Sequence, residues 1–282
     1  MTRLPRGEFQ LSREEIVRAL LQESGTTDPP TDPYRIANYL KLSVHSFTRE
    51  EYGLDPSIRA FLWPSERLIG VHQTLSSTRR NFSILHEIGH FVLPGHLHPD
   101  FVQVGKKHTD TAKNMSIDTV IQQEIEANQF AADCLFQLDR FDRKIVEAKL
   151  DWLNIQVMAQ NYHASIEATA RRWIERTSQE YALVVFNPKS RNTRNAPPSP
   201  LELLYSVTSE SFARSYFSRL ITGFEVGEES LVFRIFYGLE YRDPPEDILR
   251  VAMPDESELT FSMRLFSNSY RMFGLLTPLK RP

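Results

Sequence analysis

"SILHEIGHFVLPGH", residues Ser83–His96, is the stretch on which the interpretation of this sequence depends. It contains His86, Glu87 and His90 in the order H-E-x-x-H. On an α-helix, residues four apart lie on one face with about 6 Å between Cβ atoms, so two imidazoles can converge on one ion. The carboxylate of Glu87 can accept a proton from a water that the metal has acidified. The pattern therefore predicts a hydrolytic zinc site on a helix.

Apolar residues flank this motif and argue against two histidines that simply lie on a surface. Phe82, Leu85, Ile88 and Gly89 recur at helical spacing within the predicted helix 77–95. A polar triplet on such a helix would be half buried, where polar groups without partners are costly. We therefore favour a metal site over the alternative of two surface histidines.

The third ligand has alternatives that spacing alone leaves open. His96 stands six residues after the second histidine, as in H-E-x-x-H-x-x-G-x-x-H, but Leu93 occupies the place of the required glycine. The other candidates are Glu124 and Glu126 on the next predicted helix, which differ by about 200° around its axis. Glu124 shares a face with small residues that let a second helix come close.

The two helices together resemble a known family. "RRNFSILHEIGHFVLPGH" followed by "QQEIEANQFAADCLFQL" is similar to the ImmA/IrrE metallopeptidases, with their R-x-x-F-x-x-x-H-E-x-x-H and E-x-E-A-N-x-F-A-A patterns. The family usually continues with Leu-Leu-Met-Pro, where this chain has Leu-Phe-Gln-Leu. The resemblance implies zinc as cofactor, held by His86, His90 and Glu124, with Glu87 as catalytic base. It leaves His96 as a loop residue near the mouth of the cleft.

The same resemblance implies a function. It implies a zinc endopeptidase that cleaves a helix-turn-helix transcriptional repressor and so derepresses stress, DNA-damage or anti-phage genes. The alternative is a DNA-binding or repressor-binding regulator with a structural or vestigial metal site. Glu87 argues against this alternative, because a purely structural site has no use for a base.

Composition limits the class of protein and its compartment. The chain has 282 residues and a net charge of −3, which gives no global attraction to nucleic acid. Its single cysteine, Cys134, excludes an intrachain disulfide and favours a reducing cytoplasm. The first residues lack the apolar core of a signal peptide, and no apolar run approaches the roughly 20 residues that span a bilayer. We expect a cytoplasmic protein without a membrane partner.

The expected fold class is α+β, in four parts. A zincin-like metallopeptidase domain is expected in residues 1–150 and a helix-turn-helix-like helical pair in 151–186. A proline-rich linker is expected in 187–200, before an α+β domain in 201–282. Helices are predicted over 12–25, 33–42, 77–95, 120–138 and 140–149, within 154–179 (two) and near 211–221, and strands over 43–47, 59–64, 67–73, 181–186, 201–207 and 231–238.

Two segments outside the motif suggest nucleic acid. Arg171, Arg172 and Arg176 lie where a recognition helix would carry them, but nearby glutamates offset their charge, so we favour a scaffold role. The resemblance implies a C-terminal sensor of GAF-like fold. Basic and aromatic residues mix there, as single-stranded DNA prefers, with a small metabolite as the alternative ligand and a purely structural domain as the other interpretation. These residues are Tyr205, Arg214, Tyr216, Phe217 and Arg219.

Overall fold

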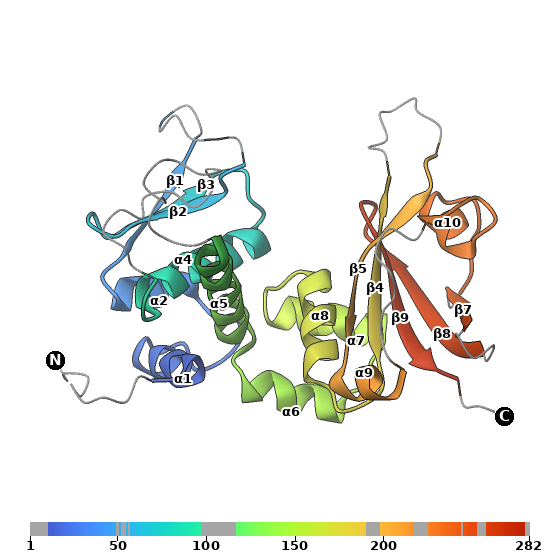
Figure 1. The fold of residues 1–282 in the computed structure, drawn as a ribbon. Coiled ribbons are helices and arrows are strands. Elements are labelled where there is room, and N and C mark those ends of the chain that lie inside the picture. Colours follow the sequence, from blue (N-terminus) through green and yellow to red (C-terminus); the bar gives the residue numbers. More distant parts are fainter. Residues whose placement is uncertain are drawn as a thin grey trace. The chain divides into compact units, whose positions relative to one another are not determined.

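The computed structural model describes residues 11–48, 51, 55, 57–96, 117–189, 198–216, 225–243, 245–252 and 258–279. The chain forms two compact units (Figure 1). The N-terminal unit comprises Met1–Phe141 and Val157–Ser165, and the C-terminal unit comprises Asp142–Gln156 and Ile166–Pro282. Each unit combines helices with a sheet, which confirms the predicted α+β class.

The sheet of the N-terminal unit has three short strands, as the sequence predicted. They are β1 (Ser43–Phe47), β2 (Ala60–Trp63) and β3 (Leu68–His72), in the order β1-β3-β2. β3 runs parallel to β1 and antiparallel to β2. The sheet is short because each strand carries only four or five residues. The helix α4 (Ser77–Val92) packs against β2 and β3.

Helices of this unit begin at residues suited to that position. Ser12 caps α1 (Arg13–Glu23) in a reciprocal pair of hydrogen bonds with Glu15, and Asp32 caps α2 (Pro33–Tyr39) through backbone amides of its first turn. α4 (Ser77–Val92) lies against β2 and β3, and α5 (Ile117–Phe136) lies against α4. These four helices confirm the predictions over 12–25, 33–42, 77–95 and 120–138.

α4 and α5 approach each other closely at one glycine. A Cβ atom on Gly89 would lie 3.0 Å from Cδ1 of Phe130 and 3.3 Å from Cα of Ala127. A Cβ at such distances would push its neighbours away by a few tenths of an ångström, so hydrogen in place of Cβ allows the two backbones to come this close. This contact positions the chemistry-bearing residues of both helices, because the H-E-x-x-H motif surrounds Gly89 and the E-x-E motif precedes Ala127.

Three further helices follow α5. α6 (Asp139–Glu147), α7 (Trp152–Asn161) and α8 (Ile166–Arg176) include the expected helix-turn-helix rhythm. The residues of α7 are divided between the two units, whereas α8 belongs to the C-terminal unit. α8 packs against two strands of that unit. The structure therefore places α8 on the sheet of the C-terminal unit.

The C-terminal unit is built on a six-stranded sheet in which all neighbours are antiparallel. Its order is β6-β5-β4-β9-β8-β7. The strands are β4 (Ala182–Pro188), β5 (Leu201–Thr208), β6 (Glu225–Val226), β7 (Glu246–Ala252), β8 (Glu258–Ser267) and β9 (Met272–Pro278). β4 and β5 pair with each other across the proline-rich segment 187–200. That segment, predicted as a linker between domains, therefore connects neighbouring strands of one sheet.

The two faces of this sheet are buried by different helices. Alternate residues of β4, such as Val184, join α9 (Glu210–Tyr216) and α10 (Leu231–Phe236) in a hydrophobic core. The residues between them face the other way, and Phe273 of β9 lies on that side against Trp152. Successive residues of β4 and β9 point to opposite faces of the sheet, and both faces are covered. This explains why both strands are almost entirely buried.

One predicted strand is wrong. Residues 231–238 were expected to be extended, but Leu231–Phe236 form the helix α10. Ser230 caps this helix by accepting a hydrogen bond from the Val232 amide at 3.2 Å. Leu231, Val232 and Phe233 all face the core, which a strand with its alternating faces would not permit.

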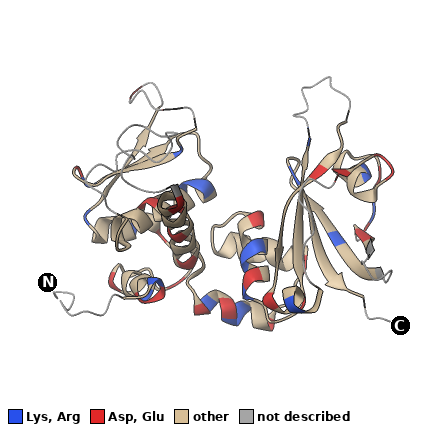
Figure 2. Ribbon diagram, viewed as in Figure 1, with Lys and Arg blue, Asp and Glu red and all other residues tan. Residues whose placement is uncertain are grey.

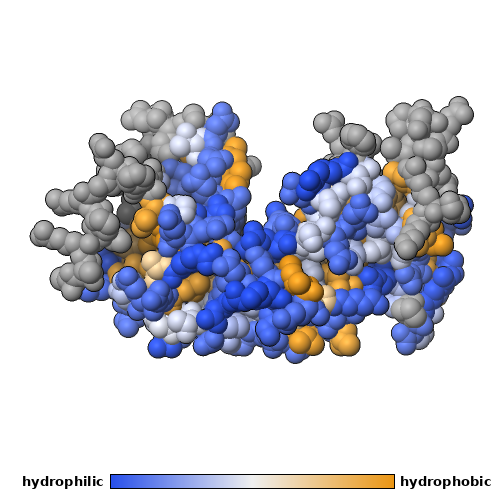
Figure 3. Space-filling view, turned by 90° about the horizontal axis from the view of Figure 1, so that it is seen from below, coloured by the Kyte–Doolittle hydropathy of each residue, from blue (hydrophilic) through white to orange (hydrophobic). Residues whose placement is uncertain are grey.

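Among the described residues, no helix is both long enough and apolar enough to cross a bilayer. On the face drawn in Figure 3, hydrophobic residues form small separate groups within a mostly hydrophilic surface.

Candidate metal centre

α4 carries the H-E-x-x-H motif on its buried side. Its apolar residues Ile84, Leu85 and Ile88 have no exposed surface, and they fix which face of the helix is turned inward. His86, Glu87 and His90 share this interior with them. A helix that buries three polar side chains needs partners for them, and the partners come from α5.

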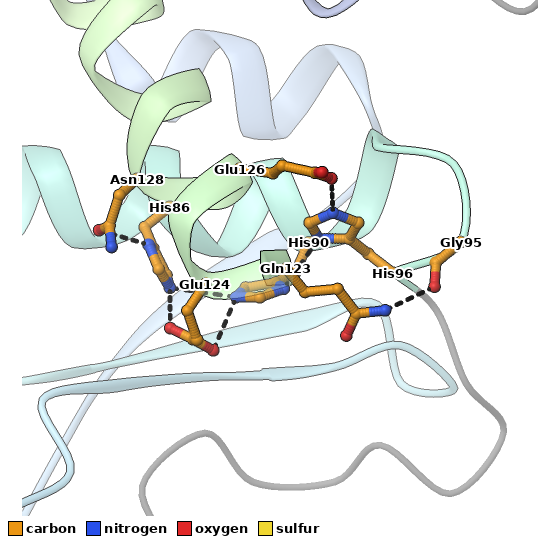
Figure 4. A network of polar contacts seen from close by, with 8 residues as sticks. All are labelled: His86, His90, Gly95, His96, Gln123, Glu124, Glu126 and Asn128. Atoms are coloured by element: carbon orange, nitrogen blue, oxygen red, sulfur yellow. Dashed lines mark hydrogen bonds and ion pairs between the residues drawn. The ribbon is translucent and has the colours of Figure 1, made fainter. Parts of the chain in front are cut away.

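Glu124 of α5 completes a group of three metal-binding side chains (Figure 4). Its carboxylate oxygens lie 3.3 Å from Nε2 of His86 and 3.3 Å from Nε2 of His90. The two imidazole nitrogens are 3.1 Å apart. The structure thus brings together the three residues that the resemblance implies as ligands.

The donor set fits zinc in chemistry and in spacing. Zinc prefers imidazole nitrogen and carboxylate oxygen at about 2.1 Å, which at tetrahedral angles places neighbouring ligand atoms about 3.4 Å apart. The three contacts between 3.1 and 3.3 Å approach this value. Three protein ligands also leave one position for water or substrate, as hydrolytic zinc sites require.

The outer nitrogen of His86 has a partner that suits a metal ligand. Its Nδ1 lies 3.1 Å from Oδ1 of Asn128, one turn after Glu124 on α5. A ligating histidine usually donates its second N–H to an oxygen, which fixes the tautomer and the direction of the ring. Asn128 can therefore hold Nε2 of His86 towards Glu124.

Glu87 lies beside the ligands but is held differently. It is 2% exposed, and within the described part of the chain its Oε2 is buried without a hydrogen-bond partner. Burial raises the pKa of Glu87 to about 7, with a smaller lowering by His86 and a smaller raising by Glu124. A carboxylate that exchanges its proton near neutrality suits a general base.

The charge distribution of the ligands also suits a cation. Burial opposes the charge of Glu124, but its contacts with His86 and His90 outweigh this and lower its pKa to about 2. Burial lowers the pKa of His90, and a neutral imidazole is the form that binds a metal. For His86, contacts with Glu124 and Glu87 outweigh burial and raise the pKa.

The other two ligand candidates, His96 and Glu126, lie outside this group of three. Nε2 of His96 is 3.0 Å from Oε2 of Glu126, and Nδ1 of His96 is 3.2 Å from Nδ1 of His90. His96 is only 1% exposed, so it is a buried residue rather than an exposed loop residue. No sequence pattern considered above indicated this contact, because it depends on the turn after α4.

The residues predicted to bind nucleic acid do not form one exposed group in the described part of the chain. The Tyr205 hydroxyl donates to Glu167 at 2.6 Å, and Tyr216 contacts Phe212 and Phe261. Arg214 pairs with Glu210 at 3.1 Å. Phe217 and Arg219 lie outside the described residues.

The arginines of α8 are likewise engaged within their own unit. Arg171 pairs with Glu175 at 2.8 Å, and Arg176 forms an ion pair with Asp142. Arg172 is buried. Figure 2 shows basic and acidic residues side by side on α6 and α8. Balanced charge of this kind does not favour α8 as a DNA-recognition helix.

Comparisons with known proteins agree with the geometry. The family model described as the IrrE N-terminal-like domain, Peptidase_M78, matches residues 38–173. A solved structure described as a Mycobacterium tuberculosis transcriptional regulator has a TM-score of 0.57 and 14% identity, covering 96% of this chain and 89% of that chain. At this identity the likeness concerns the fold.

Two other comparisons add nothing to the argument. A solved structure of a variant of RsLOV has a TM-score of 0.23 and 17% identity, covering 39% of this chain and 66% of that chain. This score is too low to indicate a common fold. No curated protein matches the chain.

Proposed function

We propose that the chain is a zinc-dependent endopeptidase that cleaves a helix-turn-helix transcriptional repressor. Its residues 38–173 match the family model described as the IrrE N-terminal-like domain, Peptidase_M78. The observation that carries this proposal is the group of His86, His90 and Glu124 beside the buried carboxylate of Glu87. Removal of the repressor would derepress stress, DNA-damage or anti-phage genes.

The residues divide the chemistry between them. His86, His90 and Glu124 would hold zinc, which when bound supplies polarisation of the scissile carbonyl and acidification of a water. Glu87 accepts the proton of the attacking water on a carboxylate oxygen as the new C–O bond forms. It then gives that proton to the amide nitrogen, so that the C–N bond breaks and a neutral amine leaves.

The rival function is a regulator in which the metal serves only the fold. The matching family model and the similar solved structure, described as a transcriptional regulator, are compatible with both functions, because either one could serve regulation. Glu87 separates them, because a structural zinc site is closed by four protein ligands and needs no buried base. Among the described residues, the metal-binding group offers three ligands.

The substrate can be sought without choosing it in advance. Zinc-loaded chain is incubated with the soluble proteome of the cell that encodes it, and new protein N-termini are mapped by mass spectrometry. The proposal expects a new N-terminus within a helix-turn-helix repressor, absent when zinc is chelated and absent with Glu87→Gln. Identical N-termini from the active chain and Glu87→Gln would reject an endopeptidase.

The role of the C-terminal unit stays a prediction. We propose that it acts as a sensor controlling cleavage, and single-stranded DNA or a small metabolite is its predicted ligand. The hydroxyl groups of Tyr205 and Tyr216 contact Glu167 and Glu180, respectively. These two side chains therefore support a structural role more directly than base stacking.

A further inference from the structure

His96 is placed behind one of the metal-binding histidines rather than among the ligands. Its Nδ1 lies 3.2 Å from Nδ1 of His90, and its Nε2 lies 3.0 Å from Oε2 of Glu126 (Figure 4). His90 and His96 are both almost fully buried, at 2% and 1% exposure. The chain of contacts therefore runs from the carboxylate of Glu126 through one imidazole to the next, away from solvent.

The direction of these hydrogen bonds is determined by the chemistry of the rings. A neutral imidazole has one N–H and one lone pair. If Nε2 of His90 offers its lone pair to a metal, the proton of His90 sits on Nδ1 and must be donated. Nδ1 of His96 is the acceptor at 3.2 Å, so the proton of His96 sits on Nε2. That proton is donated to Glu126, whose carboxylate only accepts.

The turn after α4 and one side of α5 together hold this arrangement. Gly95 adopts a positive φ of 80°, which brings the chain back towards the helix, and the His96 amide donates to the Leu93 carbonyl at 3.3 Å. The side-chain amide of Gln123 donates to the Gly95 carbonyl at 2.8 Å. Gln123 and Glu126 are three residues apart on α5, so one helix side fixes both the backbone and the ring.

We propose that His96, supported by Glu126, is a positioning residue that orients the ring of His90 and fixes its tautomer for zinc binding. This inference rests on the proposed function. His96 would accept a hydrogen bond from Nδ1 of His90, as Asn128 accepts one from Nδ1 of His86. Loss of such an outer partner typically costs 10- to 100-fold in metal affinity.

Zinc affinity, measured by competition with a chromophoric chelator, tests the proposal on the full chain. His96→Phe keeps a buried ring but removes the acceptor, and we expect it to weaken zinc binding by about 10- to 100-fold. His96→Asn restores an acceptor close to the Nδ1 position and is expected to recover part of that loss. His45→Phe, the same change at an exposed histidine, should bind zinc as the unmodified chain does.

Glu126 provides a variant in which folding is not at risk. Its side chain is 39% exposed, so Glu126→Ala should keep the thermal stability of the metal-free chain. We expect weaker zinc binding by about tenfold, and a changed visible spectrum of the cobalt-substituted protein. Gln122→Ala removes the other contact of Glu126, at 2.7 Å, and should leave both readouts unchanged.

The outcomes separate this inference from the proposed function. Unchanged zinc affinity in both His96→Phe and Glu126→Ala would overturn the positioning role and leave the proposed function standing. Equal weakening by His96→Phe and His96→Asn would also overturn it, because the acceptor nitrogen would then not matter. Failure of the unmodified chain to bind zinc would overturn the proposed function, and this inference with it.

Discussion

Glu87 differs from its neighbours on α4 in how its side chain is held. His86 and His90 have contacts on both ring nitrogens, whereas Oε2 of Glu87 is buried without a hydrogen-bond partner in the described part of the chain. A buried carboxylate oxygen without a partner is costly in a protein interior. In the proposed mechanism, the attacking water would supply the missing partner.

The Glu87→Gln variant is expected to separate catalysis from metal binding. Glutamine has nearly the same volume but cannot accept the proton, so the cleavage rate should fall by about 10²- to 10⁴-fold. Zinc content should stay that of the unmodified chain, because Glu87 is not among the three grouped ligands. Single-turnover cleavage and metal analysis on the same sample measure both.

Glu14→Gln makes the same change at an exposed carboxylate on α1 and serves as the matched control for this variant. Both its rate and its zinc content should equal those of the unmodified chain. Near-normal cleavage by Glu87→Gln would show that another group activates the water.

At the residue scale, the sequence could predict which three candidate ligands meet, but not the contacts that support them. Fixed spacing on one helix places His86 and His90 together, and the family resemblance implies Glu124 as the third residue, so the three meet as expected. His96 could not be placed in this way. Its position depends on the turn at Gly95 and on Gln123, contacts between segments that no periodicity encodes.

The site depends on the packing of the two helices α4 and α5 against each other. Gly89 lies inside the H-E-x-x-H motif, and its missing side chain allows contact with Ala127 and Phe130. Since the ligands come from both helices, the distance between the helix axes controls the distance between His90 and Glu124. A small change in packing should therefore affect zinc binding.

The Gly89→Leu variant tests this dependence. Inserting a side chain where a Cβ already meets Phe130 at 3.0 Å should overpack the contact and lower the free energy of unfolding by about 1–3 kcal/mol. Zinc affinity should fall as well, because α4 and α5 must separate. Urea denaturation of the metal-free chain and chelator competition give the two values.

The control replaces a glycine that has space around it. A Cβ on Gly227 meets nothing within 4 Å, so Gly227→Leu should leave zinc affinity unchanged. The packing argument fails if the two leucine variants bind zinc equally well.

At the scale of elements, long periodic segments were easier to predict than short ones. The apolar pattern of α4 and α5 extends over many residues and marks both helices. Residues 231–238 are too short for the pattern to decide, because "LVFRIF" suits a buried strand as well as a buried helix. The cap at Ser230 and the packing of Phe233 on the core select the helix.

Two compact units give the molecule its domain organisation, and the sequence located their boundary incompletely. Prolines in 187–200 marked a break in composition, but β4 and β5 on either side pair in one sheet. Composition reports where a chain turns and is exposed, whereas pairing between strands far apart in sequence depends on tertiary contacts. The same limitation applies to α8, which packs on β4 and β5.

Zinc should stabilise one unit selectively. All three proposed ligands lie in the N-terminal unit, and a ligand that binds only the folded state at 100 times its dissociation constant adds about 2.7 kcal/mol. We expect zinc to slow amide hydrogen exchange in α4 and α5. Amide exchange in β8, which lies between β7 and β9 in the sheet of the C-terminal unit, should stay the same.

Hydrogen exchange followed by mass spectrometry, with and without chelator, measures this difference peptide by peptide. Glu124→Ala is the control, since zinc should give it little protection at the same concentration. Equal protection of both units by zinc would contradict a single site in the N-terminal unit.

The central claim is that His86, His90 and Glu124 hold one zinc ion with a place left for water. X-ray absorption at the zinc edge of the full chain, loaded to saturation and then desalted, tests it most directly. The account predicts one zinc per chain, only nitrogen and oxygen neighbours at about 2.0–2.1 Å, two of them imidazoles, and loss of the metal in Glu124→Ala. A sulfur neighbour, a third imidazole, or full retention of zinc by Glu124→Ala would contradict it.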